Sequence, residues 1–123
     1  RGLGDVYKRQ DVRWDHGAAE EAMAALRRTA DLLDQMAQER ARVAREATAE
    51  WRGRYREEFD AHFEQMQRRA RELAEECRHA ASRIAWADHQ AYVEQKRREW
   101  DRERWRREKE AEERLRRQQQ ATS

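Results

Sequence analysis

The amino-acid sequence predicts an all-α protein built as an antiparallel helical hairpin. Of the 123 residues, 44% are charged and none is proline, which is typical of a helix-rich chain with a thin core. Apolar and small residues recur at alternating steps of four and three on both sides of Gly53, as one face of a helix requires. Gly53 falls between these two segments, where a reversal of the chain needs a residue that tolerates positive φ.

Residues 1–10 are not expected to belong to the native protein. Asp5 to Gln10 back-translate to GAT GTG TAT AAG AGA CAG, which resembles the transposase mosaic end used in making sequencing libraries. We therefore expect a sequencing-adapter scar at 1–10 and a missing native N-terminus. Without these residues the chain has 25 basic and 25 acidic residues, so its formal charge falls from +2 to zero. Only the segment from Glu94 onward keeps a basic excess.

The first helix is expected over residues 15–49, followed by a turn over residues 50–54. Asp15 is the expected N-cap, and Trp51 ends the apolar stripe. Three large apolar residues widen this stripe to one side: Leu32, Met36 and Val43. The predicted face is broad enough to contact more than one neighbouring helix.

The second helix is expected over residues 55–93, with a charged helical extension over residues 94–123 that frays at its polar C-terminus. Pairs such as Glu94 with Arg98, four residues apart, support a helix in this extension. We expect it to have no intramolecular partner, because the antiparallel first helix is only long enough to reach about Tyr92 of the second. The residues expected to form the core seam of the hairpin are Leu26, Leu33, Phe59, Phe63, Met66, Leu73 and Ile84.

A two-helix hairpin of this length is expected to pair with another hairpin. Each helix covers only one stripe of the other, so the hairpin alone buries too little surface to offset its conformational entropy. Two hairpins joined as a four-helix bundle would bury the wider face. Trp86, Val93 and Trp100 are spaced by seven residues and form a second predicted partner-contact stripe. The open alternative is that the native N-terminus, including Trp14 and the residues lost at the scar, would cover that stripe.

Two amphipathic helices joined by Trp51, Arg52 and Gly53 resemble the Trp-x-Gly (WXG) family of type VII secretion substrates, the early-secreted-antigen-like proteins of actinobacteria and firmicutes. This resemblance covers residues 12–93. It implies a non-enzymatic dimer, homo- or heterodimeric, that is secreted without a cleavable signal peptide by an ATPase-driven machine. It also implies that Trp51 and Gly53 shape the turn and a recognition surface. The family's Tyr-x-x-x-Asp/Glu export signal is absent in its usual form, because Lys96 follows Tyr92 at that spacing.

No catalytic residue, metal site or cofactor is predicted. Glu76 and His79 have the spacing found in carboxylate-bridged metal bundles, but the facing stretch, residues 27–30, offers no carboxylate. Cys77 lies two residues before His79, so their side chains would point in different directions on a helix. The sequence also contains no apolar run of the length that a membrane span requires.

Two other functions remain open at this stage. The chain could be a cytoplasmic coiled-coil adaptor that binds a partner helix. It could also bind nucleic acid through the arginines that surround Trp100 and Trp105. Acidic residues such as Glu99 and Asp101 lie among these arginines and weaken the positive field on which nucleic-acid binding depends.

Overall fold

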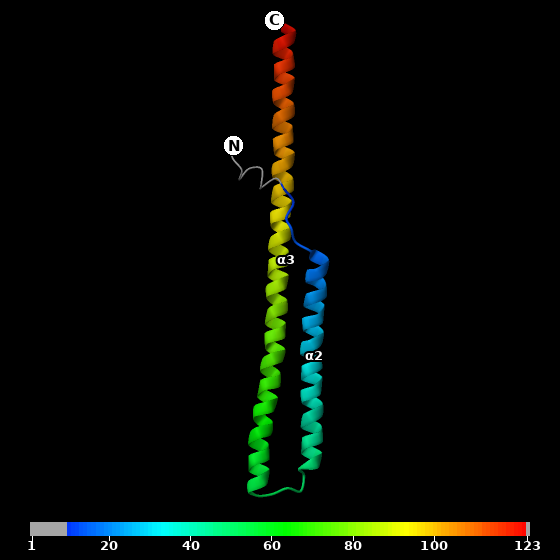
Figure 1. Ribbon diagram of the computed structural model, residues 1–123, viewed down its shortest axis with the longest axis vertical. Helices are drawn as coiled ribbons and strands as arrows, with labels where there is room; N and C mark the ends of the chain where they lie inside the picture. The colour runs from blue at the N-terminus through cyan, green and yellow to red at the C-terminus, as the bar shows by residue number, and fades with distance from the viewer. Residues whose placement is uncertain (1–9, 123) are drawn as a thin grey trace. The chain divides into compact units, whose positions relative to one another are not determined.

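The computed structural model describes residues 10–122 and contains, within that range, two α-helices and no strand (Figure 1). Helix α2 spans His16–Ala47 and helix α3 spans Arg54–Thr122. The prediction of an all-α protein is therefore confirmed. Most of the expected adapter scar, residues 1–9, lies outside the described residues. The chain divides into two units, one being His16–Trp86 and the other comprising, among the described residues, 10–15 and 87–122.

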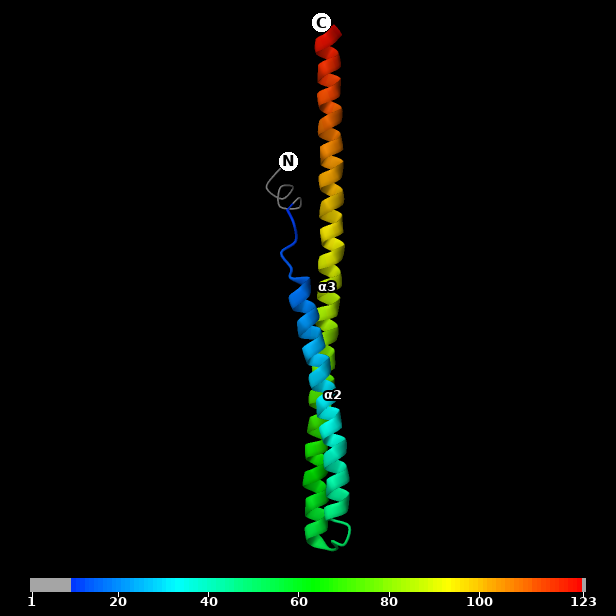
Figure 2. The same cartoon turned by 90° about the vertical axis from the view of Figure 1, so that its right-hand side faces the viewer.

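In the first unit, α2 packs against the first part of α3 in the antiparallel sense. The side-chain amide of Gln67 donates a hydrogen bond of 2.8 Å to the carbonyl of Ala37, and Arg78 forms an ion pair with Asp34. Residues later in α3 thus meet residues earlier in α2. The two views turned by 90° agree that α2 lies alongside this part of α3 (Figures 1 and 2).

The buried line between α2 and α3 consists mostly of small side chains. Its buried residues are Ala19, Met23, Ala30 and Ala37 of α2, and Gln67, Ala74 and Ala81 of α3. The spacing of seven between successive members on α3 is that of an antiparallel coiled-coil seam. Among the described residues no large side chain is fully buried, so the core is as thin as the composition predicts.

The expected core seam lies beside this line and not on it. Leu26, Leu33, Phe59, Phe63 and Ile84 are only half-buried. Met66 and Leu73 are exposed, with 55% and 47% of their surface accessible. Each of these two residues directly precedes a buried residue of α3, and successive helical residues are rotated by about 100°. Their side chains therefore point to one side of the seam, and their assignment to the core is corrected.

The helix boundaries lie close to the expected ones. α2 ends at Ala47, two residues before the expected end, and α3 begins at Arg54, one residue before the expected start. The charged extension expected over residues 94–123 is helical to Thr122 and continues α3 without a break. Ion pairs between residues four apart follow this continuation, as between Arg98 and Glu94 at 3.1 Å. Since neither glycine nor proline follows Gly53, nothing in the sequence interrupts the helix.

In the second unit, the residues that precede α2 contact the continuation of α3. The backbone N–H of Val12 donates to the side chain of Gln95 at 2.8 Å, and Gln95 donates in turn to Asp11 at 2.9 Å. Asp11 also forms an ion pair with Arg102 at 3.0 Å. The expectation that the segment from Glu94 onward has no intramolecular partner is therefore wrong. The reason is that a short non-helical segment reaches residues of α3 that α2 was not expected to cover.

Candidate interaction surface

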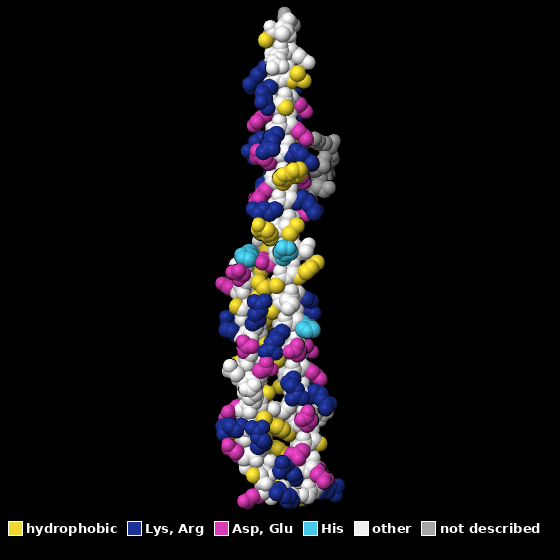
Figure 3. Space-filling model, turned by 180° about the vertical axis from the view of Figure 1, so that it is seen from behind, with side chains coloured by type: hydrophobic (Ala, Val, Ile, Leu, Met, Phe, Trp, Pro, Cys, Tyr) yellow, Lys and Arg dark blue, Asp and Glu magenta, His cyan; other side chains and the backbone are white. Residues whose placement is uncertain are grey.

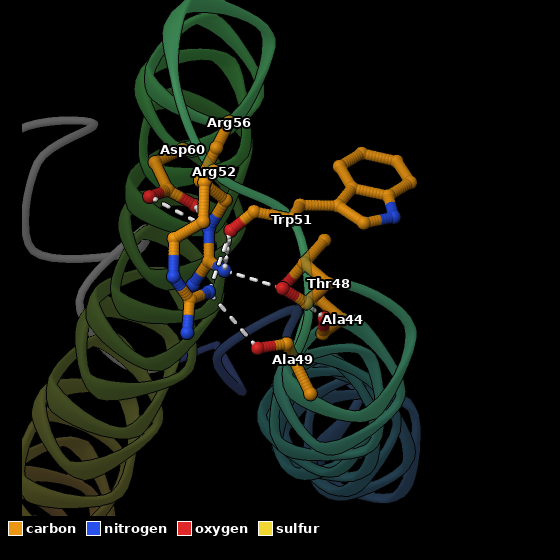
Figure 4. Close-up of polar contacts among 7 residues, drawn as sticks. All are labelled: Ala44, Thr48, Ala49, Trp51, Arg52, Arg56 and Asp60. Atoms are coloured by element: carbon orange, nitrogen blue, oxygen red, sulfur yellow. Dashed lines mark hydrogen bonds and ion pairs between the residues drawn. The ribbon is translucent and has the colours of Figure 1, made fainter.

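The connection between the helices, residues 48–53, begins with a compact turn. Thr48 is buried, with 2% of its surface exposed, although it is polar. Its hydroxyl donates to the carbonyl of Ala44 at 2.6 Å, and its own carbonyl accepts from the backbone N–H of Trp51 at 3.0 Å (Figure 4). The Ala44 carbonyl also accepts the backbone N–H of Thr48 at 3.0 Å, so only the bond from Trp51 satisfies a carbonyl that the end of the helix leaves without a helical partner.

Two arginines complete the connection by donating to carbonyl groups that follow α2 directly. Arg52 reaches the carbonyls of Ala49, at 3.1 Å, and of Trp51, at 2.7 Å. Arg56 donates to the carbonyl of Thr48 and also forms an ion pair with Asp60 at 3.0 Å (Figure 4). A cation near the C-terminus of a helix also interacts favourably with the helix dipole. The end of α2 is thus fixed by side chains that belong to the following segment.

Gly53 supplies the change of backbone direction that starts α3. Its φ is +86°, the only positive φ among the described residues. Its carbonyl accepts the backbone N–H of Glu57 at 3.2 Å, which is the first turn of the helix. An L-residue with a side chain is strained at this φ, so the backbone itself requires glycine here.

Trp51 lies at the end of the first unit with part of its indole exposed. Its ring and that of Phe59 form a T-shaped pair with the centroids 5.6 Å apart, and Phe59 stacks on Phe63 at 5.7 Å. The indole points away from the guanidinium groups of Arg52 and Arg56 (Figure 4), and 46% of Trp51 is exposed. The three rings form a row that starts at the connection and continues along α3.

This aromatic row leads into an apolar groove between α2 and α3. We use the name apolar groove for two adjoining hollows of about 480 and 440 Å³ that share Arg40, His62 and Met66. The hydrophobic residues that line the groove are Leu33, Val43, Ala44, Ala47, Phe59, Phe63, Met66, Ala70 and Leu73. The large apolar side chains displaced from the seam are therefore gathered on one side of the helix pair.

The polar groups that line the apolar groove are mostly basic. Arg40 lines both hollows, and Arg69 lines the one that contains Leu73. Neither guanidinium group has an ion pair with any residue between 10 and 122. The one acidic residue at the groove is Glu39, whose carboxylate accepts hydrogen bonds from Arg42. The groove thus combines an apolar lining with unpaired positive charge.

Paired charges stabilise the helix pair elsewhere on its surface. Arg78 of α3 reaches Asp34 and Asp31 of α2, the latter at 3.2 Å. Hydrogen bonds to Asp34 and then Asp31 raise the pKa of the Arg78 guanidinium further above its usual range. Figure 3 shows a face of the molecule on which positive and negative side chains interleave along the helices.

The three residues of the predicted partner-contact stripe are all exposed. The accessible fractions are 67% for Trp86, 39% for Val93 and 65% for Trp100. Trp86 belongs to the first unit and the other two belong to the second. Trp14 donates its indole N–H to Asp88 at 2.7 Å. The contact stripe and the alternative in which the missing native N-terminus covers it both stay predictions.

The basic C-terminal part of α3 presents charges that are largely neutralised along the helix. Arg97, Arg104 and Arg106 each pair with an acidic residue three positions away, at 3.2 to 3.6 Å. Arg104 also lies over the ring of Trp100, 5.1 Å from its centroid. This pairing reduces the field available to phosphate groups.

The residues considered for metal binding and catalysis do not come together. His79 approaches Glu75, at 4.0 Å, and not a cluster that includes Glu76. Over residues 10–122, no three side chains of the metal-binding types gather at one point. Cys77 is half-buried on α3 as a free thiol. In the same range neither helix has a stretch long and apolar enough to cross a lipid bilayer.

Sequence reasoning did not identify Gln67, Thr48 and Arg56. Gln67 is buried in the seam, and its side-chain oxygen has no hydrogen-bond partner. The available signal was the spacing of seven that joins Gln67 to Ala74 and Ala81, where small residues allow close approach of two helices. The roles of Thr48 and Arg56 follow from the path of the turn, which no local pattern specifies.

Comparison with known proteins adds no assignment: no family model, no curated protein and no solved structure matches this chain.

Proposed function

We propose that the protein is not an enzyme and works as half of a four-helix bundle, which it forms with another helical hairpin through the apolar groove. The observation that carries this proposal is the exposure of Val43, Met66 and Leu73 on one side of the seam. An exposed apolar patch bordered by polar residues is typical of a protein–protein interaction site. A second pair of helices offers a matching apolar stripe of the same length.

Substitution within the groove tests this proposal. Leu73 is 47% exposed, so burying the rest of this side chain in an interface contributes about 1 kcal/mol to the binding free energy. Leu73→Glu loses this term and also places a carboxylate against apolar surface. We expect association with a helical partner to weaken by at least about tenfold. The measurement is sedimentation equilibrium at high protein concentration, with and without added salt.

Leu115→Glu is the matched control, because Leu115 is similarly exposed, at 57%, but lies in the other unit. This variant should associate like the wild type. A wild-type protein that stays helical and monomeric under all these conditions, alone and with other helical hairpins, would contradict the proposal.

We further propose that the bundle is a type VII secretion substrate or substrate partner, which rests on the resemblance of the Trp51–Gly53 connection to the Trp-x-Gly family. The structural feature that favours it is the partly exposed indole of Trp51 at the end of the helix pair. In a host with a type VII system and the natural partner, we expect the protein in the culture medium. Trp51→Ala should reduce export, whereas Tyr55→Ala, which removes a neighbouring exposed ring, should not.

Retention of the wild type in the cytoplasm, with its partner co-expressed, would refute export and leave the adaptor function. An adaptor would form the same stable helical complex inside the cell. The four-helix bundle and export are therefore tested independently, because association is measured in solution and export is measured in the culture medium.

A further inference from the structure

The unpaired charges of the apolar groove indicate what kind of partner can bind there. Arg40 lines both hollows of the groove, so it lies within the surface to be covered and not at one end of it. Arg69 lines one hollow, and His62 lines both. None of these three side chains forms an ion pair with a residue between 10 and 122. Other arginines of the same helices, such as Arg42 and Arg78, do pair with carboxylates.

A partner that covers this groove must compensate the charge of Arg40. Burying a charged group without a partner costs several kcal/mol, whereas a charge paired with a carboxylate keeps most of its favourable interactions. The groove itself offers no free carboxylate, because Glu39 is already bound by Arg42. The compensating charge therefore has to come from the occupant.

A second copy of this chain does not supply that charge. In a two-fold symmetric dimer the same surface patch of each copy meets the other. Two apolar grooves placed together bring Arg40 and Arg69 of one copy near the same residues of its partner. The lining of the groove contains no unpaired acidic residue with which either guanidinium could form an ion pair. Self-pairing thus places like charges in an apolar interface.

We propose that Arg40 and Arg69 determine partner choice, so that the groove binds a different helical hairpin with carboxylates on its apolar face at the level of these arginines. This inference rests on the proposed four-helix bundle and names the kind of chain that completes it. Like charges at an interface suppress the wrong partner, and complementary charges fix the register of the right one. The apolar side chains of the groove supply affinity, and the two arginines supply selection.

A charge-reversed copy of the same chain serves as a surrogate for the acidic partner. The probe is the full-length variant Arg40→Glu/Arg69→Glu, mixed with wild-type protein. Both arginines are exposed and unpaired, so their replacement leaves the packing of the helix pair intact, and circular dichroism verifies this. We expect the mixed dimer to form at least about tenfold more tightly than the wild-type homodimer. The advantage should shrink in high salt, because salt screens charges that are not deeply buried.

The matched control is Arg28→Glu/Arg68→Glu, which reverses one arginine of each helix outside the lining of the groove. Its mixture with wild type should associate no more tightly than the wild type alone. A second variant, Arg40→Leu, removes the charge without adding another, and should strengthen self-association. Fluorescence-detected sedimentation of labelled wild type measures all of these mixtures.

The outcomes separate this inference from the function on which it rests. A wild-type homodimer as tight as the charge-reversed mixture would overturn partner selection by Arg40 and Arg69 and leave the four-helix bundle standing, with a second copy as the occupant. Absence of association in every mixture, at low and high salt and with intact helices, would overturn the bundle and the inference together.

Discussion

Replacing Gly53 by alanine is expected to destabilise the helix pair by about 1–2 kcal/mol, and the structure identifies a single cause. The φ of Gly53 is +86°, a left-handed conformation that costs a residue with a Cβ atom about this much. An added Cβ would meet no atom within 4 Å, so no steric clash contributes. The gain that alanine usually brings by restricting the unfolded chain applies only where the native backbone suits it, and here the backbone does not.

Urea unfolding followed by circular dichroism measures this change, at one fixed protein concentration because association also stabilises the fold. Gly53→Asn should lose less, since asparagine tolerates the left-handed region better. Gly17→Ala is the control of opposite sign: Gly17 lies in the first turn of α2, where alanine should stabilise by up to about 1 kcal/mol. If Gly53→Ala were as stable as wild type, the connection would not depend on positive φ, and the reasoning would be refuted.

Three further predictions concern polar contacts of the two units. Gln67→Met should raise the free energy of unfolding by about 1 kcal/mol, because it removes a buried oxygen without a hydrogen-bond partner; a large loss of stability would show that the bond to Ala37 matters more. Arg78→Ala should lower the urea midpoint, and less so in high salt, because it removes the ion pairs that Arg78 forms with α2; a salt-independent loss would indicate packing instead. The hydrogen bond from Gln95, and then the charge of Arg102, hold the pKa of Asp11 below its usual 3.8, so the contact with α3 should be intact above that pH and be lost as the pH falls through the lowered value. The loss of the contact should change the side-chain amide resonance of Gln95 in NMR spectra. The part of this change that titration of Asp11 causes should be absent in Asp11→Asn.

The sequence alone predicts the helices, because helical periodicity depends on residues that are close in the chain. The four-three periodicity and the position of Gly53 identify both ends of α2, the connection and the start of α3 within two residues. The structure contains no strand among residues 10–122 to compete with these helices. On α3, however, the side that forms the seam was misjudged, because Gln67, Ala74 and Ala81 are buried there and not Met66 and Leu73. Periodicity locates an apolar stripe, but it does not say whether large or small residues of that stripe meet the neighbouring helix.

The candidate site, too, could be predicted from the sequence only in part. Exposed Trp51 and the requirement for glycine at residue 53 could be anticipated, since both depend on residues close in sequence. The apolar groove could not, because it depends on the angle at which the two helices face each other. The buried side of each helix holds small residues, among them Ala30, Ala37, Ala74 and Ala81. The contact of Asp11 with Arg102 was missed for a related reason: a segment without periodicity gives no indication of where it lies.

The alanine-lined seam has a consequence for how much of the protein exists in the cell. A seam of small side chains buries little apolar area, so the helix pair by itself has only a small margin against unfolding. Whatever occupies the groove adds its binding free energy to that margin by mass action. Abundance of this chain should therefore follow the supply of its partner, with proteases removing the copies that are made in excess.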